Sequence, residues 1–102
     1  MVVKHNLVNN DLYLYFYGEI DEHGVSGQKA KIDKLIDENA FVKSVIFNFE
    51  NVSFMDSTGI GMLIGRYKKI KSYNIAAFVQ NPPSNVQKIM QISGLYKILP
   101  II

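Results

Sequence analysis

Residues 51–67 of this 102-residue chain read Asn51-Val52-Ser53-Phe54-Met55-Asp56-Ser57-Thr58-Gly59-Ile60-Gly61-Met62-Leu63-Ile64-Gly65-Arg66-Tyr67. From Ile60 onward the apolar side chains recur at intervals of three and four residues, which predicts an amphipathic helix that runs to about Ser72. The residues directly before this pattern, Asp56, Ser57 and Thr58, are of the types that cap helix N-termini. The stretch therefore predicts a helix whose exposed N-terminus carries Ser57.

Three glycines stand in the predicted helix, and they do not form a nucleotide-binding loop. The spacing of Gly59, Gly61 and Gly65 differs from the dinucleotide-binding fingerprint, and no Gly-Lys-Ser or Gly-Lys-Thr sequence marks a phosphate-binding loop. Glycine inside a helix costs about 0.8–1 kcal/mol relative to alanine. Because Gly61 and Gly65 are four residues apart on one helix face, we expect them to let the helix approach a sheet closely.

An N-terminal hairpin is predicted ahead of this stretch. Residues 12–17 alternate leucine or phenylalanine with tyrosine, which predicts a strand that ends at Gly18 and turns its three tyrosines to the less buried face. Residues 2–8 form a weaker strand pattern. The Asn-Asn-Asp sequence at 9–11 is typical of a turn, so the two strands should pair.

The rest of the chain alternates helices with strands. Helices are predicted over residues 25–39, where glycines weaken the first turn, and after the Pro-Pro-Ser sequence at 82–84. Apolar strands are predicted at 44–49 and 75–79, and a short apolar tail with a last short strand at 95–102. The order β-β-α-β-α-β-α predicts one α/β domain over residues 1–102, with a four- to five-stranded mixed sheet and helices mainly on one face.

Composition and charge narrow the function classes. The chain has no cysteine, which excludes disulfides, thiol catalysis and thiolate metal sites. Residues 1–56 carry five lysines and all nine acidic residues, a net charge of −4, whereas residues 57–102 carry six basic residues and no acid, a net charge of +6. No apolar run is long enough for a membrane span or a signal peptide, so we expect a soluble cytoplasmic protein.

Enzyme signatures are incomplete, and we expect no catalytic residue, metal site or cofactor of the chain's own. A serine nucleophile elbow requires glycine two residues before and after the serine, but Ser57 has Met55 before it. The only histidines are His5 and His23, in a predicted strand and a predicted loop, and both are expected to be solvated surface residues.

A nucleic-acid-binding module is the alternative to a protein-binding one. Four basic residues cluster between Arg66 and Lys71, and three tyrosines line one strand face, where aromatic rings can stack on bases. The formal net charge is only +2, and cations near a helix C-terminus also complement its dipole. A solvated helix face and an ordinary sheet surface therefore explain these residues more simply.

Ser57 admits two compatible interpretations. As a helix N-cap it would contribute about 1 kcal/mol to stability. As a phosphorylation site it would use the positive partial charge and free N–H groups of a helix N-terminus, which can stabilise a phosphoserine. The phosphate would add about −1.5 to −2 charges beside Asp56.

Three blocks of the sequence together resemble a known family. The stretch Phe54–Lys71 resembles the signature of bacterial anti-sigma factor antagonists, which are members of the STAS domain family, and its Gly65-Arg66-Tyr67-Lys68 continuation is most similar to the sporulation branch. Gly18-Glu19-Ile20-Asp21 resembles the second motif of that family, and Ile92–Ile98 resembles the third.

The resemblance implies a phosphorylation-controlled binding protein. An unphosphorylated antagonist binds an anti-sigma factor that is also a serine kinase and so releases the sigma factor; the kinase then uses its own ATP to phosphorylate the serine that corresponds to Ser57. A metal-dependent serine phosphatase resets the cycle. The chain would bind neither nucleic acid nor membrane and would be a monomer when free. The residues expected at the partner surface are Asp56, Ser57, Thr58, Gly59, Ile60, Glu19 and Asp21.

Two further expectations concern the rim and the end of the domain. Glu19 and Asp21 follow a strand and could contact basic residues of the partner, although solvated loop acids explain them equally well. Family members usually continue into a C-terminal helix beyond the third motif, whereas this sequence stops at Ile102, so that helix is expected to be absent. A scaffold module of a stress-signalling assembly, built on the same fold, is a third interpretation.

Overall fold

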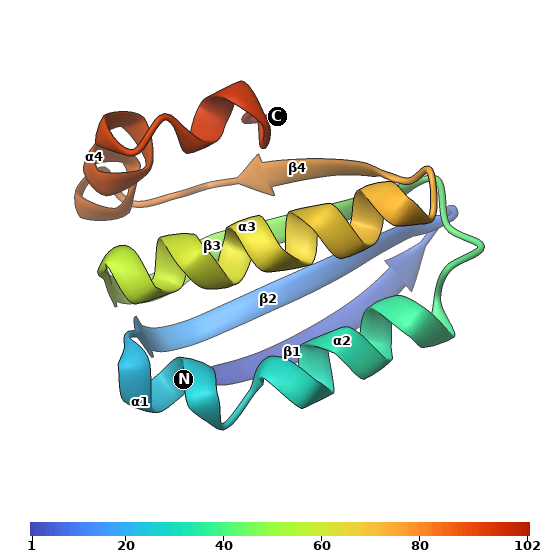
Figure 1. The fold of residues 1–102 in the computed structure, drawn as a ribbon, viewed down its shortest axis with the longest axis horizontal. Helices are drawn as coiled ribbons and strands as arrows, with labels where there is room; N and C mark the ends of the chain where they lie inside the picture. The colour runs from blue at the N-terminus through green and yellow to red at the C-terminus, as the bar shows by residue number, and fades with distance from the viewer.

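Four strands form one mixed sheet in the order β1-β2-β3-β4. The computed structural model describes residues 1–102. In chain order the strands are β1 (Val2–Val8), β2 (Asp11–Ile20), β3 (Ser44–Met55) and β4 (Ala76–Gln80). β1 pairs antiparallel with β2, whereas β2 with β3 and β3 with β4 are parallel. Figure 1 shows the strands side by side behind the helices, which confirms the predicted mixed sheet.

The β1–β2 connection is the predicted hairpin. Asn9 and Asn10 both adopt left-handed backbone conformations, with φ of 51° and 66°. Two consecutive positive φ angles are typical of the type I′ turn, whose twist matches that of the strands it joins. β2 does not end at Gly18, as the sequence predicted, because a left-handed backbone at this glycine (φ 92°) lets the strand continue to Ile20.

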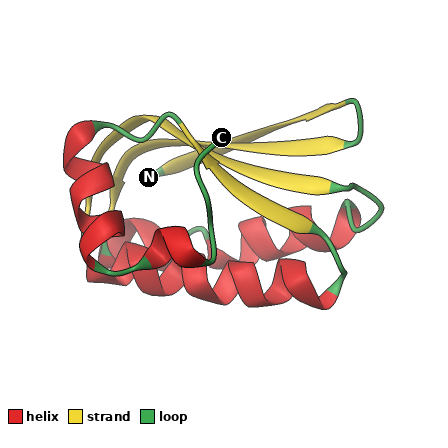
Figure 2. Cartoon of the chain, turned by 90° about the horizontal axis from the view of Figure 1, so that it is seen from above, coloured by secondary structure: helices red, strands yellow, loops and turns green.

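The helices pack on one face of the sheet or at its end, as predicted, and the other face carries none (Figure 2). Their bounds are α1 (Glu22–Ser26), α2 (Lys29–Glu38), α3 (Ser57–Ser72), α4 (Ser84–Ile92) and the 3-10 helix η1 (Leu95–Lys97). The prediction of a single helix over residues 25–39 is wrong, because the structure has two helices there, separated at Gly27 and Gln28. The break follows from the low helix propensity of glycine, and α1 starts earlier than predicted because Asp21 caps it.

The core lies between the helices and the sheet. On β2 the inward side chains Leu12, Leu14 and Phe16 are fully buried, and Phe16 packs against Phe47 and Phe49 of β3 at ring-centroid distances of 6.0 and 5.3 Å. The tyrosines that alternate with them are half-buried on the helix-free face, as their sequence pattern predicted.

β3 and the C-terminal segment differ from the prediction. β3 continues to Met55 instead of ending near residue 49, because it runs alongside the whole length of β2. The last strand predicted in residues 95–102 is reduced to an isolated bridge between Val79 and Ile101, since η1 takes up the preceding residues. No helix of the structure has both the length and the apolar character that crossing a membrane requires.

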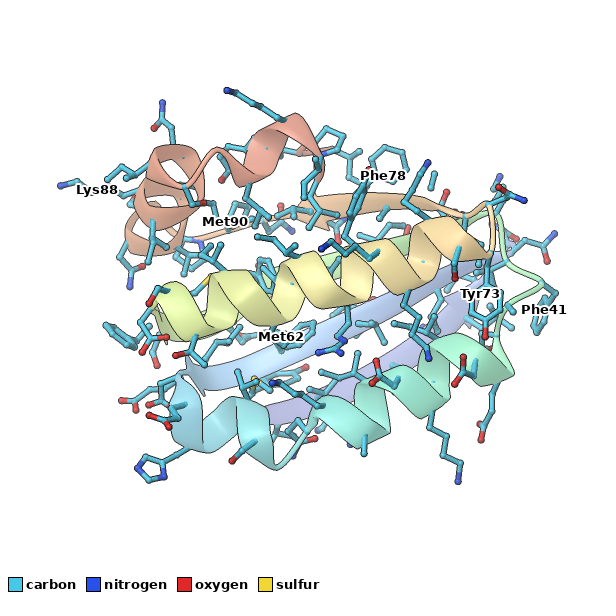
Figure 3. The ribbon with its side chains drawn as sticks, viewed as in Figure 1. Phe41, Met62, Tyr73, Phe78, Lys88 and Met90 are labelled. Carbon is cyan, nitrogen blue, oxygen red and sulfur yellow. The ribbon has the colours of Figure 1, made fainter.

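The basic residues late in α3 are partly engaged by α2. Nε of Arg66 lies 2.9 Å from Oδ1 of Asp33, and Nζ of Lys69 lies 3.0 Å from Oδ1 of Asp37. The Tyr73 hydroxyl also donates to Asp37. Figure 3 shows Tyr73 and Phe41 at the same end of the molecule, away from α1. Two members of the predicted basic cluster are therefore ion-paired rather than simply solvated.

The Asp37 contacts predict a pH-dependent contribution to stability. The hydrogen bond from Tyr73, followed by the contact with Lys69, holds the pKa of Asp37 below its ordinary value. A lowered pKa stabilises the folded state above the unfolded-state pKa of about 3.9, and this contribution is lost as the pH falls through the folded-state pKa. Asp37→Asn should therefore lower the free energy of unfolding at pH 7, and the difference from wild type should narrow below about pH 4.

Urea unfolding of both proteins at several pH values measures this difference. Glu38→Gln is the matched control, because its 3.7 Å pair with Lys34 is largely exposed and should contribute little. A difference between wild type and Asp37→Asn that stays constant from pH 7 to pH 3 would contradict the assignment.

Candidate functional site

The parallel strands β2 and β3 end next to each other, and each is followed by an aspartate that caps the next helix. Ile20 pairs with Met55 in the register of the two strands, so Asp21 and Asp56 come directly after paired residues. The N–H of Asp56 donates to the carbonyl of Ile20 at 3.4 Å. The starts of α1 and α3 are therefore brought to the same edge of the sheet. The sequence analysis placed both Glu19 and Asp21 after the strand, which is wrong for Glu19, because β2 continues to Ile20.

Asp56, not Ser57, is the N-cap of α3. Its Oδ1 accepts the N–H of Thr58 at 2.9 Å and the N–H of Gly59 at 3.3 Å. The prediction that Ser57 caps the helix is therefore wrong, because a carboxylate one residue earlier already takes the two N–H groups that a cap satisfies. Ser57 is instead the first helical residue; it is exposed, and neither its hydroxyl nor its N–H makes a hydrogen bond.

Gly59 is the glycine that lets α3 approach the sheet. A Cβ at this position would lie 2.8 Å from Cγ of Met55, 2.9 Å from Cγ2 of Ile20 and 3.0 Å from the Ile20 carbonyl oxygen. The sequence assigned this role to Gly61 and Gly65, which is wrong, because a Cβ at either position would meet nothing within 4 Å. Those two glycines face away from the core.

The predicted partner-facing residues differ in how far they are exposed. Ser57 and Glu19 are exposed, whereas Asp21, Asp56 and Thr58 are half-buried. Gly59 and Ile60 are buried, so they support the site from below and offer almost no surface to a partner.

The sequence interpretation missed Phe54, which is 45% exposed although it is large and apolar. It lies opposite Glu19 in the register of β3 with β2, next to a register shift in the pairing of the two strands. The shift breaks the strict alternation of buried and exposed side chains, and the neighbour Ser53 is exposed as well. From the sequence alone, an apolar residue at the end of a strand is expected in the core. The irregular pairing of β2 with β3 explains why the ring of Phe54 is exposed instead.

The two chain segments that meet at this edge of the sheet carry acidic side chains and no basic ones apart from His23. Glu19, Asp21, Glu22 and Asp56 belong to the two neighbouring chain segments, and the sequence has no lysine or arginine between Lys43 and Arg66. The pKa of Asp21 is lowered, chiefly because its carboxylate accepts the N–H of Gly24 at 2.9 Å. This carboxylate therefore remains ionised at neutral pH.

Neither the histidines nor the acids form a catalytic or metal-binding cluster. His5 lies on β1 and His23 on α1, both exposed, and no hydrogen bond joins either side chain to Ser57. No group of three or more histidine and acidic side chains is arranged to hold a metal ion.

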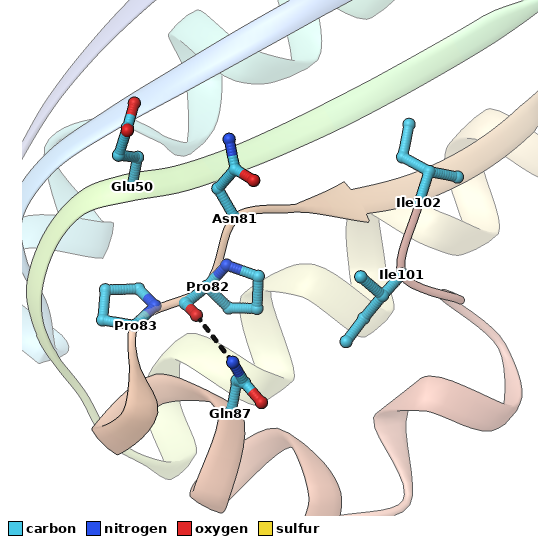
Figure 4. A pocket seen from close by; sticks show the side chains of 7 residues that line it. All are labelled: Glu50, Asn81, Pro82, Pro83, Gln87, Ile101 and Ile102. Atoms are coloured by element: carbon cyan, nitrogen blue, oxygen red, sulfur yellow. Dashed lines mark hydrogen bonds between the residues drawn. The ribbon is translucent and has the colours of Figure 1, made fainter.

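The cavity of the structure lies away from Ser57. It measures about 530 Å³ and opens beside the C-terminal end of β4 and the middle of β3 (Figure 4). Its lining residues are Glu50, Asn81, Pro82, Pro83, Gln87, Ile101 and Ile102. The Gln87 side-chain amide donates to the Pro82 carbonyl at 3.0 Å, so one of its polar groups is already satisfied within the protein.

Comparison with known proteins places this geometry in a family context. The sequence model described as "STAS domain" matches residues 2–102. The chain is 37% identical over 79 residues to the anti-sigma F factor antagonist of Lysinibacillus sphaericus, across 78% of this chain and 67% of that protein. It is 29% identical over 99 residues to the anti-sigma-B factor antagonist of Bacillus subtilis, across 97% of this chain and 86% of that protein.

Solved structures agree with this match. The unphosphorylated form of the anti-sigma factor antagonist SpoIIAA superposes with a TM-score of 0.79 at 30% identity, over 99% of this chain and 88% of that one. The phosphorylated form of the Bacillus cell fate determinant SpoIIAA superposes with a TM-score of 0.73 at 31% identity, over 99% of this chain and 91% of that one.

The three glycines of α3 should respond in opposite directions to the same substitution. Gly59→Ala should destabilise the protein, because Met55 and Ile20 must shift to admit the methyl group. Gly61→Ala and Gly65→Ala should each raise the free energy of unfolding by about 1 kcal/mol, since alanine is the better helix former and the added methyl meets no neighbour.

Urea unfolding of the three single variants measures the effect, and Gly61→Ala and Gly65→Ala serve as matched controls for Gly59→Ala. Equal stabilisation by all three substitutions would show that α3 does not approach the sheet at Gly59.

Proposed function

This chain belongs to the STAS domain family, and we propose that it works there as an anti-sigma factor antagonist whose unphosphorylated form binds an anti-sigma factor and thereby frees the sigma factor. Among the relatives compared, those named anti-sigma F factor antagonists are 36% and 37% identical to it, and those named anti-sigma-B factor antagonists are 24% and 29% identical. The higher identities favour the sporulation branch.

The proposed phosphorylation switch rests on the exposure and hydrogen bonding of the Ser57 side chain. Its hydroxyl is exposed, makes no hydrogen bond, and stands at the first residue of a helix that is already capped by Asp56. A kinase could reach this oxygen without unfolding any element. The solved SpoIIAA structures in both phosphorylation states superpose on this chain, which supports a phosphate being tolerated by this fold.

The switch would act through charge at the docking surface. An unmodified hydroxyl permits close approach, whereas a phosphate adds about −1.5 to −2 charges beside Asp56 and near Glu19 and Asp21. Like charges brought together in an interface cost several kcal/mol. Each 1.4 kcal/mol weakens binding tenfold, so a single phosphate is sufficient to release the partner.

The remaining roles belong to the partners. The anti-sigma factor would be the serine kinase and would bind the ATP, so this chain would be a substrate and not an enzyme. A metal-dependent serine phosphatase would restore the free hydroxyl. The exposed Glu19 and half-buried Asp21 would contact basic residues of the kinase at the rim. We place the cycle in the cytoplasm, where bacterial transcription occurs, with the free antagonist as a monomer.

The two alternative functions, a nucleic-acid-binding module and a scaffold module of a signalling assembly, are not favoured. Tyr13 and Tyr15 stack on each other with a centroid distance of 6.1 Å, so part of their ring surface is not available to bases. Arg66 and Lys69 are paired with aspartates of α2. A scaffold module would share the fold, but the relatives named above are antagonists of anti-sigma factors.

Substitution of Ser57 should separate binding from switching. With the cognate anti-sigma factor kinase, Ser57→Ala should bind about as tightly as the unmodified wild type and should not be phosphorylated. Ser57→Asp should bind at least tenfold more weakly, because it places a permanent negative charge at the docking surface. Titration calorimetry measures the affinities, and intact-mass analysis after incubation with kinase and ATP measures the phosphate.

Thr58→Ala is the matched control, since Thr58 carries the neighbouring hydroxyl on the same helical turn. It should still gain one phosphate of about 80 Da, the mass that phosphorylation adds. Labelling of Ser57→Ala to the wild-type level would refute the assignment of the site.

A further inference from the structure

We propose that Asp56 closes the anion-binding end of α3, so that a phosphate on Ser57 is kept out of the helix terminus and projects from the surface toward the partner. Asp56 would then set the strength of the switch. This inference rests on the proposed phosphorylation of Ser57 and concerns the regulation of that same site.

The hydrogen bonds at the start of α3 carry the argument. A helix N-terminus attracts anions through its first N–H groups, which lack partners within the helix. Here the N–H groups of Thr58 and Gly59 donate to Oδ1 of Asp56, and the N–H of Ile60 donates to the carbonyl of Asp56 at 3.3 Å. Of the first four N–H groups of α3, only that of Ser57 has no acceptor. The carboxylate of Asp56 therefore already occupies the position at the helix N-terminus where an anion would bind.

Asp56 is held in place by the sheet. Its N–H donates to the carbonyl of Ile20, and the preceding residue Met55 is buried and packs against the helix at Gly59. If the carboxylate rotated away to admit a phosphate, two N–H groups of a half-buried turn would lose their acceptor. The phosphate would therefore have to displace a carboxylate that the backbone holds in register.

Neither of the two chain segments that meet at this edge, residues 19–22 and 54–60, contains a lysine or arginine that could bind the phosphate. The adjoining β2–α1 segment supplies the acids Glu19, Asp21 and Glu22, and the groups there that can carry positive charge are His23 and the N-terminal amine, both of which interact with Asp21. A phosphate on Ser57 would thus meet like charge within its own protein. Such a group serves as a repulsive element against the partner, and the backbone need not move.

Asparagine at position 56 tests the role of the charge. Asn is about as good an N-cap as Asp, so Asp56→Asn should keep the hydrogen bonds to Thr58 and Gly59 and remove the negative charge. Phosphoserine can be placed at position 57 during translation by genetic code expansion. The measurement then needs no kinase, and failure of the kinase to label Ser57 would be a separate result that bears on the proposed function only.

Two measurements decide the matter. In the wild-type background, phosphoserine at position 57 should raise the unfolding equilibrium constant by about fivefold or more, as expected for like charges near a protein surface. In Asp56→Asn the increase should be clearly smaller, because the nearest negative charge is removed while Glu19, Asp21 and Glu22 remain. In ¹⁵N-resolved NMR spectra, the amide protons of Thr58 and Gly59 should keep their chemical shifts when wild-type Ser57 is phosphorylated, because Asp56 remains their acceptor. The Glu38→Gln background, which removes an exposed charge on α2, should respond to phosphoserine as wild type does.

Contrary results are equally clear. Large downfield shifts of the Thr58 and Gly59 amide protons on phosphorylation would show that the phosphate displaces Asp56 and would overturn the proposal. The proposal would also be overturned if phosphoserine lowered the stability of wild type and Asp56→Asn equally. It would likewise be overturned if phosphoserine did not lower the stability of wild type. The chemical-shift measurement uses only the wild-type sequence, so it stands even where the Asp56→Asn variant folds poorly.

Discussion

The first turn of α3 lies so close to the ends of β2 and β3 that no side chain fits between them at Gly59. This contact fixes the height of the helix above the sheet and its point of entry. Because α3 begins at this contact, the carboxylate of Asp56 lies within hydrogen-bond distance of the N–H groups of Thr58 and Gly59. The side chain of Ser57, the next residue, is exposed to solvent. The exposure of Ser57 is thus a consequence of packing at a glycine two residues later.

The two ends of α3 are held by different forces. Its first turn is held by close packing and by the Asp56 cap, whereas its last turns are joined to α2 through Asp33 with Arg66 and Asp37 with Lys69. Because α3 is fixed at both ends, phosphorylation of Ser57 is expected to move its backbone little. A charge added there acts at the surface instead, which fits a fold that SpoIIAA keeps in its unphosphorylated and phosphorylated forms.

Particular residues show how far the sequence could be interpreted. The alternation in β2 correctly predicted Leu12, Leu14 and Phe16 in the core, because a strand has only two faces and one of them packs on helices. Helix interruption and glycine roles were harder to predict. The early start of α1 depends on a cap formed by Asp21, which the glycine-rich sequence obscured. Whether Gly59 or Gly61 meets the sheet depends on the rotation of α3 about its axis, which the weakly amphipathic pattern left open.

The sequence by itself determined the α/β order of elements, the mixed sheet with its hairpin, the family, and Ser57 as the candidate for modification. These follow from local periodicity and from motifs that are contiguous in the chain. Only the tertiary structure decided that Asp56 is the cap, that Gly59 is the close-contact glycine, that Phe54 is exposed, and that Asp21 and Asp56 lie at the same edge of the sheet. The last three of these depend on the register of β2 against β3. Register is set by packing between segments more than thirty residues apart, so no local sequence pattern reports it.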